Sequence, residues 1–210
     1  MTLEGAVMRS RFPVIIVLAA WAWAAAAHGS AVIDQIKADI AADPNNADLY
    51  TELALEYEGV KDYVNAIKAY QMAIGLAPSD ANLRFRLAET YLADDKLGPA
   101  IDEYRSAVRL DAGLYKSYFQ IGRAYLGMKQ YDEAVKAFNE YLKSSPYDFD
   151  ALWYLGQSFE GAGKNKDAYE VYEKILDYST GPFASAGRVG VFGTSDDLQK
   201  YMKKIEKKLP

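Results

Sequence analysis

Four segments of this sequence align with one another at a spacing of 34 residues, with no insertion or deletion between them. In the first half of each segment, a large aliphatic residue and a small residue precede an aromatic ring. In the second half, a small residue again precedes an aromatic ring. These columns are Leu53, Leu87, Ile121 and Leu155; Ala54, Ala88, Gly122 and Gly156; Tyr57, Tyr91, Tyr125 and Phe159; Ala66, Ala100, Ala134 and Ala168; and Tyr70, Tyr104, Phe138 and Tyr172. A repeat of this length predicts a stack of similar units in place of one globular core.

The apolar residues inside each segment predict helices. They fall three and four positions apart, as Leu53 and Tyr57 do, whereas strands would show alternation. A small residue lets two antiparallel helices approach closely, because the missing side chain leaves space for the aromatic ring of the other helix. One pair of short helices buries too little apolar surface to fold alone, so we expect each pair to depend on its neighbours. The expected fold class is all-α.

This pattern resembles the tetratricopeptide repeat (TPR) family, which combines a large residue, Leu, Gly or Ala and Tyr on one helix with Ala, an aromatic residue and Pro on the next. The closing proline is present as Pro78 and Pro146, and Ala112 and Thr180 replace it in the other two segments. The resemblance predicts four repeats at residues 47–80, 81–114, 115–148 and 149–180. It implies a curved solenoid of antiparallel helix pairs that binds other proteins and performs no chemistry.

Residues 1–27 lie outside the repeats and are typical of an export signal. Arg9 and Arg11 precede an apolar run that extends from Phe12 to Ala27. A charged start, an apolar stretch and small residues before a cleavage site are the three parts of a Sec signal peptide. The run is also nearly long enough to stay in the membrane as a signal-anchor. We therefore expect a protein that is exported and periplasmic or extracellular, with an uncleaved anchor as the alternative.

The segments that flank the repeats are expected to cap the stack. Residues 31–46 read as a short helix and a turn at the N-terminal end. Residues 181–194 are rich in Gly and Ser and read as a linker or a degenerate repeat. Residues 195–210 begin with Ser195, a good N-cap, and place apolar residues on one stripe of a lysine-rich helix. This last helix is expected to cover the final repeat, and the alternative is a basic amphipathic helix on an anionic membrane.

The composition argues against catalysis and against nucleic acid as a partner. The chain has no cysteine and a single histidine, His28, which lies at the expected cleavage junction. Thiol chemistry, nucleophilic triads and histidine metal sites therefore have no residues to use in the repeats. The formal net charge of −5 would repel phosphate backbones. We expect no enzyme activity, no cofactor and no metal.

The TPR resemblance implies that the first helix of each repeat lines a concave groove. Transferred to this sequence, the groove positions are Thr51, Leu55, Asn82, Phe85, Glu89, Leu92, Lys116, Phe119, Arg123, Leu126, Trp153 and Gln157. Among these, Phe85, Phe119 and Trp153 lie 34 residues apart and outside the core columns, so we expect them to anchor a bound peptide. Two alternatives are that these rings pack sideways against neighbouring helices, or that the chain's own terminal segment fills the groove.

Two cations are the candidates for orienting a ligand in this groove. Lys116 and Arg123 would bind an acidic group, or they are solvated charges on the surface. The Lys and Asn clamp by which some TPR proteins hold a terminal carboxylate is absent, because Thr51 and Leu55 occupy its positions in the first repeat.

The sequence thus predicts a non-catalytic adaptor or assembly factor of the cell envelope, whose groove holds a segment of another envelope protein. The competing predictions are a structural protein that self-assembles into a filament or tube, and a membrane-anchored subunit of a larger complex.

Overall fold

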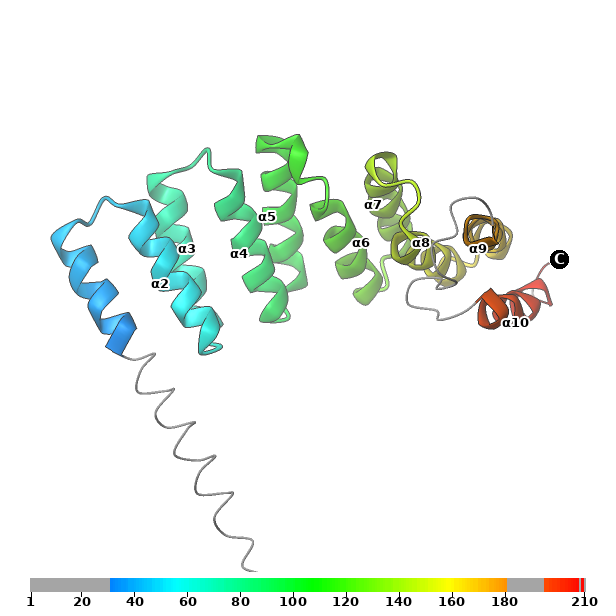
Figure 1. Ribbon diagram of the computed structural model, residues 1–210, viewed down its shortest axis with the longest axis horizontal. Coiled ribbons are helices and arrows are strands. Elements are labelled where there is room, and N and C mark those ends of the chain that lie inside the picture. Colours follow the sequence, from blue (N-terminus) through cyan, green and yellow to red (C-terminus); the bar gives the residue numbers. More distant parts are fainter. Residues whose placement is uncertain (1–30, 181–194, 208, 210) are drawn as a thin grey trace, which may run out of the picture. The chain divides into compact units, whose positions relative to one another are not determined.

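A computed structural model describes residues 31–180, 195–207 and 209. The expected export signal and the linker at 181–194 lie outside these residues. Within the described ranges every regular element is a helix, which confirms the predicted all-α class (Figure 1). None of the helices described is both long enough and apolar enough to cross a membrane. The chain divides into two compact units, with the boundary between Leu76 and Ala77.

The first unit contains a helix at residues 31–42, α2 (Ala47–Gly59) and α3 (Tyr63–Leu76). Asn46 begins α2 by accepting a hydrogen bond from the backbone N–H of Asp48. Such a cap satisfies one of the N–H groups that a helix leaves without a partner at its start. Ile33 and Ile36 of the first helix are buried, and the Lys37 ammonium lies 5.7 Å from the centre of the Tyr57 ring on α2.

The second unit contains three helix pairs and a final helix. Its elements are α4 (Ala81–Ala93), α5 (Leu97–Leu110), the short 3₁₀ helix η1 (Ala112–Leu114), α6 (Ser117–Gly127), α7 (Tyr131–Ser144), α8 (Phe149–Gly161), α9 (Asn165–Thr180) and α10 (Ser195–Glu206). Each pair packs internally, and successive pairs are joined by contacts of α5 with α6 and of α7 with α8. The last helix, α10, packs against α9 (Figure 1). Helices that follow one another along the chain of this unit therefore pack against one another.

The small residues of the repeat lie where the first helix of a pair contacts the aromatic ring of the second helix. A Cβ atom placed on Gly122 would lie only 2.7 Å from the Phe138 ring, and one on Gly156 would overlap the Tyr172 ring. Ala54 and Ala88 fill the same column in the earlier repeats and are fully buried. The structure thus confirms that the small and aromatic columns fit each other across each helix pair.

The turn inside each repeat has the same backbone conformation in all four cases. One residue per turn lies in the left-handed region, with φ of 59° at Lys61, 56° at Asp95, 57° at Lys129 and 74° at Gly163. These positions are again 34 residues apart. A left-handed residue after the last turn of a helix redirects the chain and satisfies its terminal carbonyl groups, as in the hydrogen bond from Lys61 N–H to the Glu58 carbonyl.

Candidate functional site

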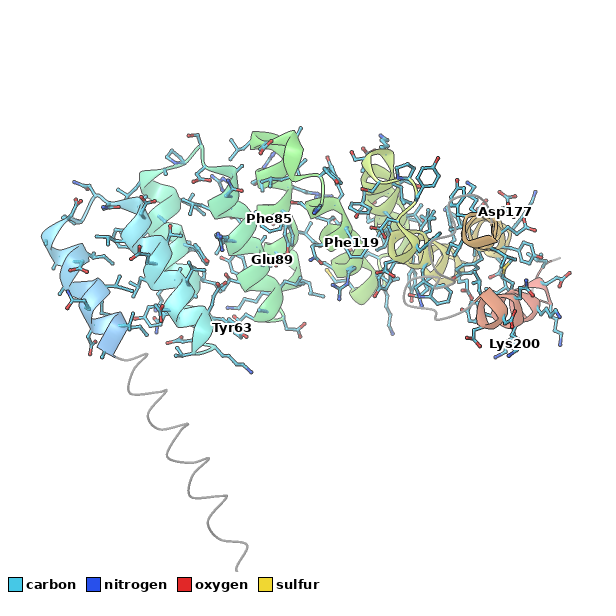
Figure 2. All side chains as sticks on the ribbon, viewed as in Figure 1. Tyr63, Phe85, Glu89, Phe119, Asp177 and Lys200 are labelled. Atoms are coloured by element: carbon cyan, nitrogen blue, oxygen red, sulfur yellow. The ribbon has the colours of Figure 1, made fainter. Side chains whose placement is uncertain are left out.

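The positions expected to contact a partner lie on the first helix of each repeat. In the second unit, α4, α6 and the residue before α6 carry eight of them, and we call these the first-helix face: Asn82, Phe85, Glu89, Leu92, Lys116, Phe119, Arg123 and Leu126. Asn82, Glu89, Lys116 and Arg123 are exposed, and the four apolar side chains are half-buried. Figure 2 labels three of these residues, Phe85, Glu89 and Phe119. The face combines apolar rings with charges of both signs.

The other four predicted positions are distributed differently. Thr51 and Leu55 belong to the first unit, where Thr51 is half-buried and donates to the Ala47 carbonyl at 2.9 Å. Leu55 is exposed over 40% of its surface. On α8, Gln157 is half-buried and Trp153 is buried.

The rings at the column of expected anchors rest on the core. Phe85 lies 5.5 Å from Tyr104 at an interplanar angle of 70°, and Phe119 lies 5.9 Å from Phe138 at 72°. Both pairs are edge-to-face contacts between the first and the second helix of a repeat, a favourable geometry for aromatic rings. Sideways packing is therefore real, but it leaves Phe85 and Phe119 only half-buried. Their remaining surface is available to a ligand.

The expectation of an exposed ring is wrong for Trp153. Its side chain is only 8% exposed, and its ring lies 5.0 Å from Tyr172 and 5.2 Å from Tyr201 of α10. The helix α10 is held there by three buried apolar residues, which are Leu198, Met202 and Ile205. At this end of the second unit, the chain's own terminal segment occupies the place that the sequence assigned to a partner.

A carboxylate fastens α10 to this position. Glu160 of α8 accepts hydrogen bonds at its Oε1 atom from the Tyr172 hydroxyl at 2.8 Å and from the Tyr201 hydroxyl at 2.7 Å. Burial, and secondarily the bond to Glu160, raises the pKa of Tyr201 to about 12. One acceptor thus connects α8, α9 and α10.

Hydrogen bonds between tyrosine and glutamate recur along the chain, and sequence reasoning missed them. Tyr70 donates to Glu58 at 3.3 Å, and Tyr104 donates to Glu89. Burial, followed by the bond from its glutamate, raises the pKa of Tyr104 and of Tyr172 far above the ordinary value. The third repeat has Phe138 at the tyrosine column, and there the aligned glutamate positions hold Arg123 and Leu126. The tyrosine and the glutamates are thus absent from the same repeat, as expected because a ring without a hydroxyl needs no acceptor. This coincidence in the sequence could have indicated the hydrogen bonds.

The cation Arg123 lies among aromatic rings. Its guanidinium group donates to Gln120 Oε1 at 3.3 Å and lies 6.0 Å from the centre of the Tyr154 ring on α8. Its charge also acts against the rise in the pKa of Tyr104 on α5. Arg123 of the third repeat is therefore close to an aromatic ring of the fourth repeat.

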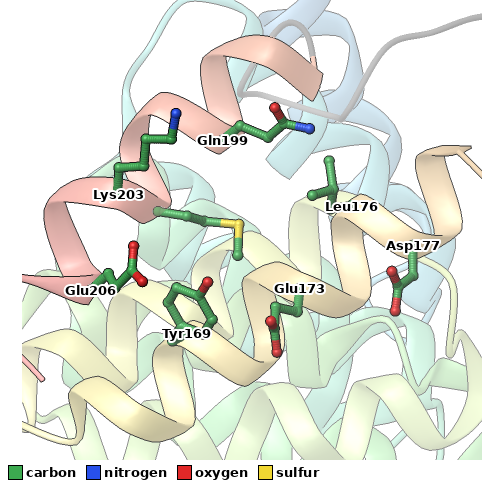
Figure 3. A pocket seen from close by; sticks show the side chains of 8 residues that line it. Tyr169, Glu173, Leu176, Asp177, Gln199, Lys203 and Glu206 are labelled. Atoms are coloured by element: carbon green, nitrogen blue, oxygen red, sulfur yellow. The ribbon is translucent and has the colours of Figure 1, made fainter.

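A hollow of about 390 Å³ lies between α9 and α10 (Figure 3). Tyr169, Glu173, Lys203 and Glu206 line it together with apolar atoms of Leu176. Desolvation and then the two glutamates raise the pKa of Tyr169. The described residues contain no group of three or more histidine, aspartate or glutamate side chains arranged to hold a metal ion. The hollow is thus a gap along the flank of α10.

Comparison with known proteins settles the family. A family model described as tetratricopeptide repeat matches residues 51–114 and 119–184. The chain belongs to the tetratricopeptide repeat family. TPR folds are scaffolds for protein interaction, so this TPR protein belongs to a family of interaction scaffolds.

Solved structures agree with the TPR fold. A crystal structure of MamA protein has a TM-score of 0.66 at 23% identity, covering 74% of this chain and 85% of that one. MamA residues 41 to the end from Desulfovibrio magneticus RS-1 give 0.59 at 13% identity, covering 77% and 95%. YrrB, described as a TPR protein with an unusual peptide-binding site, gives 0.63 at 17% identity, covering 89% and 87%. At these identities the likeness concerns the fold alone. No curated protein matches the chain.

Proposed function

We propose that this TPR protein is an adaptor that holds an extended or helical segment of another protein against the first-helix face of α4 and α6. The observation that supports this most directly is the pair Phe85 and Phe119. They occupy equivalent positions on α4 and α6, each makes an edge-to-face contact with a core ring of its own repeat, and each remains partly exposed. Rings held rigidly at regular intervals are suitable anchors, because little side-chain entropy is lost on binding.

The charged residues on the same face indicate which charge the partner segment carries. Arg123 and Lys116 lie on the α6 side, and Glu89 lies on α4. A segment with two apolar side chains that also carries an acidic group toward α6 would satisfy the rings and the cations together. Thr51 and Leu55 remain candidate contacts of the first unit. Trp153 and Gln157 are candidates only where α10 leaves room for a partner.

The test is to quantify the proteins that co-purify with the chain from its source cells. Replacing Phe85 and Phe119 by Ala together should abolish or strongly reduce the captured partner while the circular dichroism spectrum stays helical. Tyr147→Ala is the matched control, because Tyr147 is an aromatic residue 52% exposed outside this face. Equal capture by the double variant and the control would reject the first-helix face as the binding surface.

We also propose that the adaptor works in the cell envelope. The support is the charged start and apolar run of residues 1–27. The N-terminal sequence of the protein isolated from its cells tests this directly. A mature chain that begins close to His28 supports Sec export with cleavage. An intact N-terminus in the membrane fraction supports a retained anchor, and an intact N-terminus in the cytosol would contradict the proposal.

A further inference from the structure

A second cleft lies on a different face of the same unit. Its larger part, about 650 Å³, is bounded by α5, η1 and the beginning of α6. A smaller part of about 170 Å³ continues between α5, α6 and α7, and both parts share Arg105 and Tyr118. We call the two parts together the α5–α7 cleft and identify it by Arg105, Val108, Arg109, Tyr118, Ile121 and Ala137.

This cleft is separate from the first-helix face. On α6 the cleft residues are Tyr118, Ile121 and Tyr125, whereas the first-helix face uses Phe119, Arg123 and Leu126. Successive residues of an α-helix are turned by about 100°, so the two sets lie on different sides of α6. A ligand in the cleft would not compete with one that binds to Phe85 and Phe119.

The floor of the cleft is apolar. Val108 of α5 and Ala112 of η1 line the larger part, and Ile121 and Ala137 line the smaller part. Tyr118 is half-buried between them. Such a floor accepts a large apolar side chain, because the contact removes apolar surface of both partners from water.

Two guanidinium groups at the rim have no carboxylate partner among the described residues. Arg105 lies 5.6 Å from the centre of the Tyr125 ring, and Arg109 donates to Ser106 Oγ at 2.9 Å. The neighbouring cations differ, since Arg84 pairs with Glu103 at 3.0 Å and Lys136 pairs with Glu133 at 2.7 Å. Asp102 also lines the larger part, where the excess is one positive charge, while Glu133 and Glu140 line the smaller part and pair with Lys136 and Lys143.

We propose that the α5–α7 cleft is a second protein-binding surface that takes a short acidic segment of a partner. A large apolar side chain of the segment lies on the floor beside Tyr118. An adjacent carboxylate binds Arg105 or Arg109, whose planar guanidinium groups suit two-point contact with a carboxylate. The chain as a whole has a net charge of −5, whereas the larger part of the cleft has an excess of one positive charge, which favours an acidic partner segment over a basic one.

The test is a selection from a library of random dodecapeptides displayed on phage, carried out in parallel with four forms of the full chain. They are the unchanged chain, Arg105→Gln with Arg109→Gln, Phe85→Ala with Phe119→Ala, and a control with Lys166→Gln and Lys174→Gln. The control removes two exposed charges from α9. Circular dichroism establishes that all four forms have the same helix content.

We expect the unchanged chain to enrich peptides in which Asp or Glu adjoins a large apolar residue. The arginine variant should lose this class, and a selected peptide should bind it at least about tenfold more weakly. The phenylalanine variant and the lysine control should retain the class. Enrichment of no acidic-apolar class would overturn the proposal, and so would a class lost equally in the arginine variant and the lysine control. A class lost only in the phenylalanine variant would assign such peptides to the first-helix face instead.

Discussion

At the scale of single residues, the close spacing of paired helices depends on a glycine in the first helix of two of the repeats. Gly122 and Gly156 allow the rings of Phe138 and Tyr172 to lie directly against the backbone of the first helix. This arrangement could be predicted from the sequence, because a small column and an aromatic column repeat with the same period. The tyrosine–glutamate hydrogen bonds are harder to predict, since their acceptors come from two different columns, at Glu58 and Glu160 and at Glu89.

Gly156→Ala should lower the free energy of unfolding by about 1–3 kcal/mol, because the added methyl group overlaps the Tyr172 ring. Urea unfolding measures the change. Gly75→Ala in α3 is the matched control, as a Cβ there meets nothing within 4 Å. The control should be neutral or stabilising by up to about 1 kcal/mol. Equal losses in both variants would contradict the close approach of α8 and α9.

Substitutions at two of the left-handed turn residues should change stability in opposite directions. Gly163→Ala should destabilise the protein by about 1–2 kcal/mol, because a side chain is strained at a φ of 74°. Lys129→Gly relieves the same strain at a φ of 57° and should raise the midpoint of thermal unfolding. A fall in the midpoint for Lys129→Gly, or no change for Gly163→Ala, would show that these turns are not left-handed in solution.

At the scale of elements, α10 (Ser195–Glu206) is only partly predictable from the sequence. Its start and its apolar stripe could be predicted from Ser195 and the helical spacing of the residues that follow. The sequence also predicts that this helix covers the final repeat, but it does not show that Trp153 is the residue covered, because α10 follows a break in the 34-residue register. The repeat pattern aligned Trp153 with Phe85 and Phe119 in one column, although only Phe85 and Phe119 remain partly exposed.

Removing the helix after residue 194 should expose Trp153. The measurement is tryptophan fluorescence in a chain with Trp21→Phe and Trp23→Phe, in which Trp153 is the remaining tryptophan. We expect emission at longer wavelength and stronger quenching by acrylamide, because Tyr201 no longer covers the ring. Lys200→Ala on the exposed side of α10 should leave both unchanged. An unshifted spectrum after truncation would contradict the covering of Trp153.

The hydroxyl of Tyr201 should make the attachment of α10 sensitive to alkaline pH. Its pKa is raised to about 12, so the folded state favours the protonated phenol. The stability that this group contributes is complete below about pH 10 and is lost as the pH rises toward 12. Tyr201→Phe removes the bond to Glu160 and should show a smaller loss of stability over that interval. Urea unfolding at pH 9 and pH 11, chosen as about one unit either side of the ordinary tyrosine value, tests the difference. Identical losses in both proteins would contradict it.

At the scale of the whole molecule, the repeat period predicted the fold class and the family, and it predicted much less of the function. The repeats show which face of each helix is used for packing, because the packing columns are shared by all four segments. The positions expected to bind a partner differ between repeats, as Leu55, Glu89, Arg123 and Gln157 do within a single column. A period therefore locates a surface but does not identify what binds to it.

The most direct test of the adaptor function is site-specific photo-crosslinking in the source cells. A photoreactive amino acid replaces Glu89 on the first-helix face in one strain and Lys174 on α9 in another, both of which are exposed. We predict a crosslinked product with one dominant foreign protein from position 89, none from position 174, and loss of the product when Phe85 and Phe119 are replaced by Ala. The same product from both positions, or none from position 89, would contradict the claim that this face binds a partner.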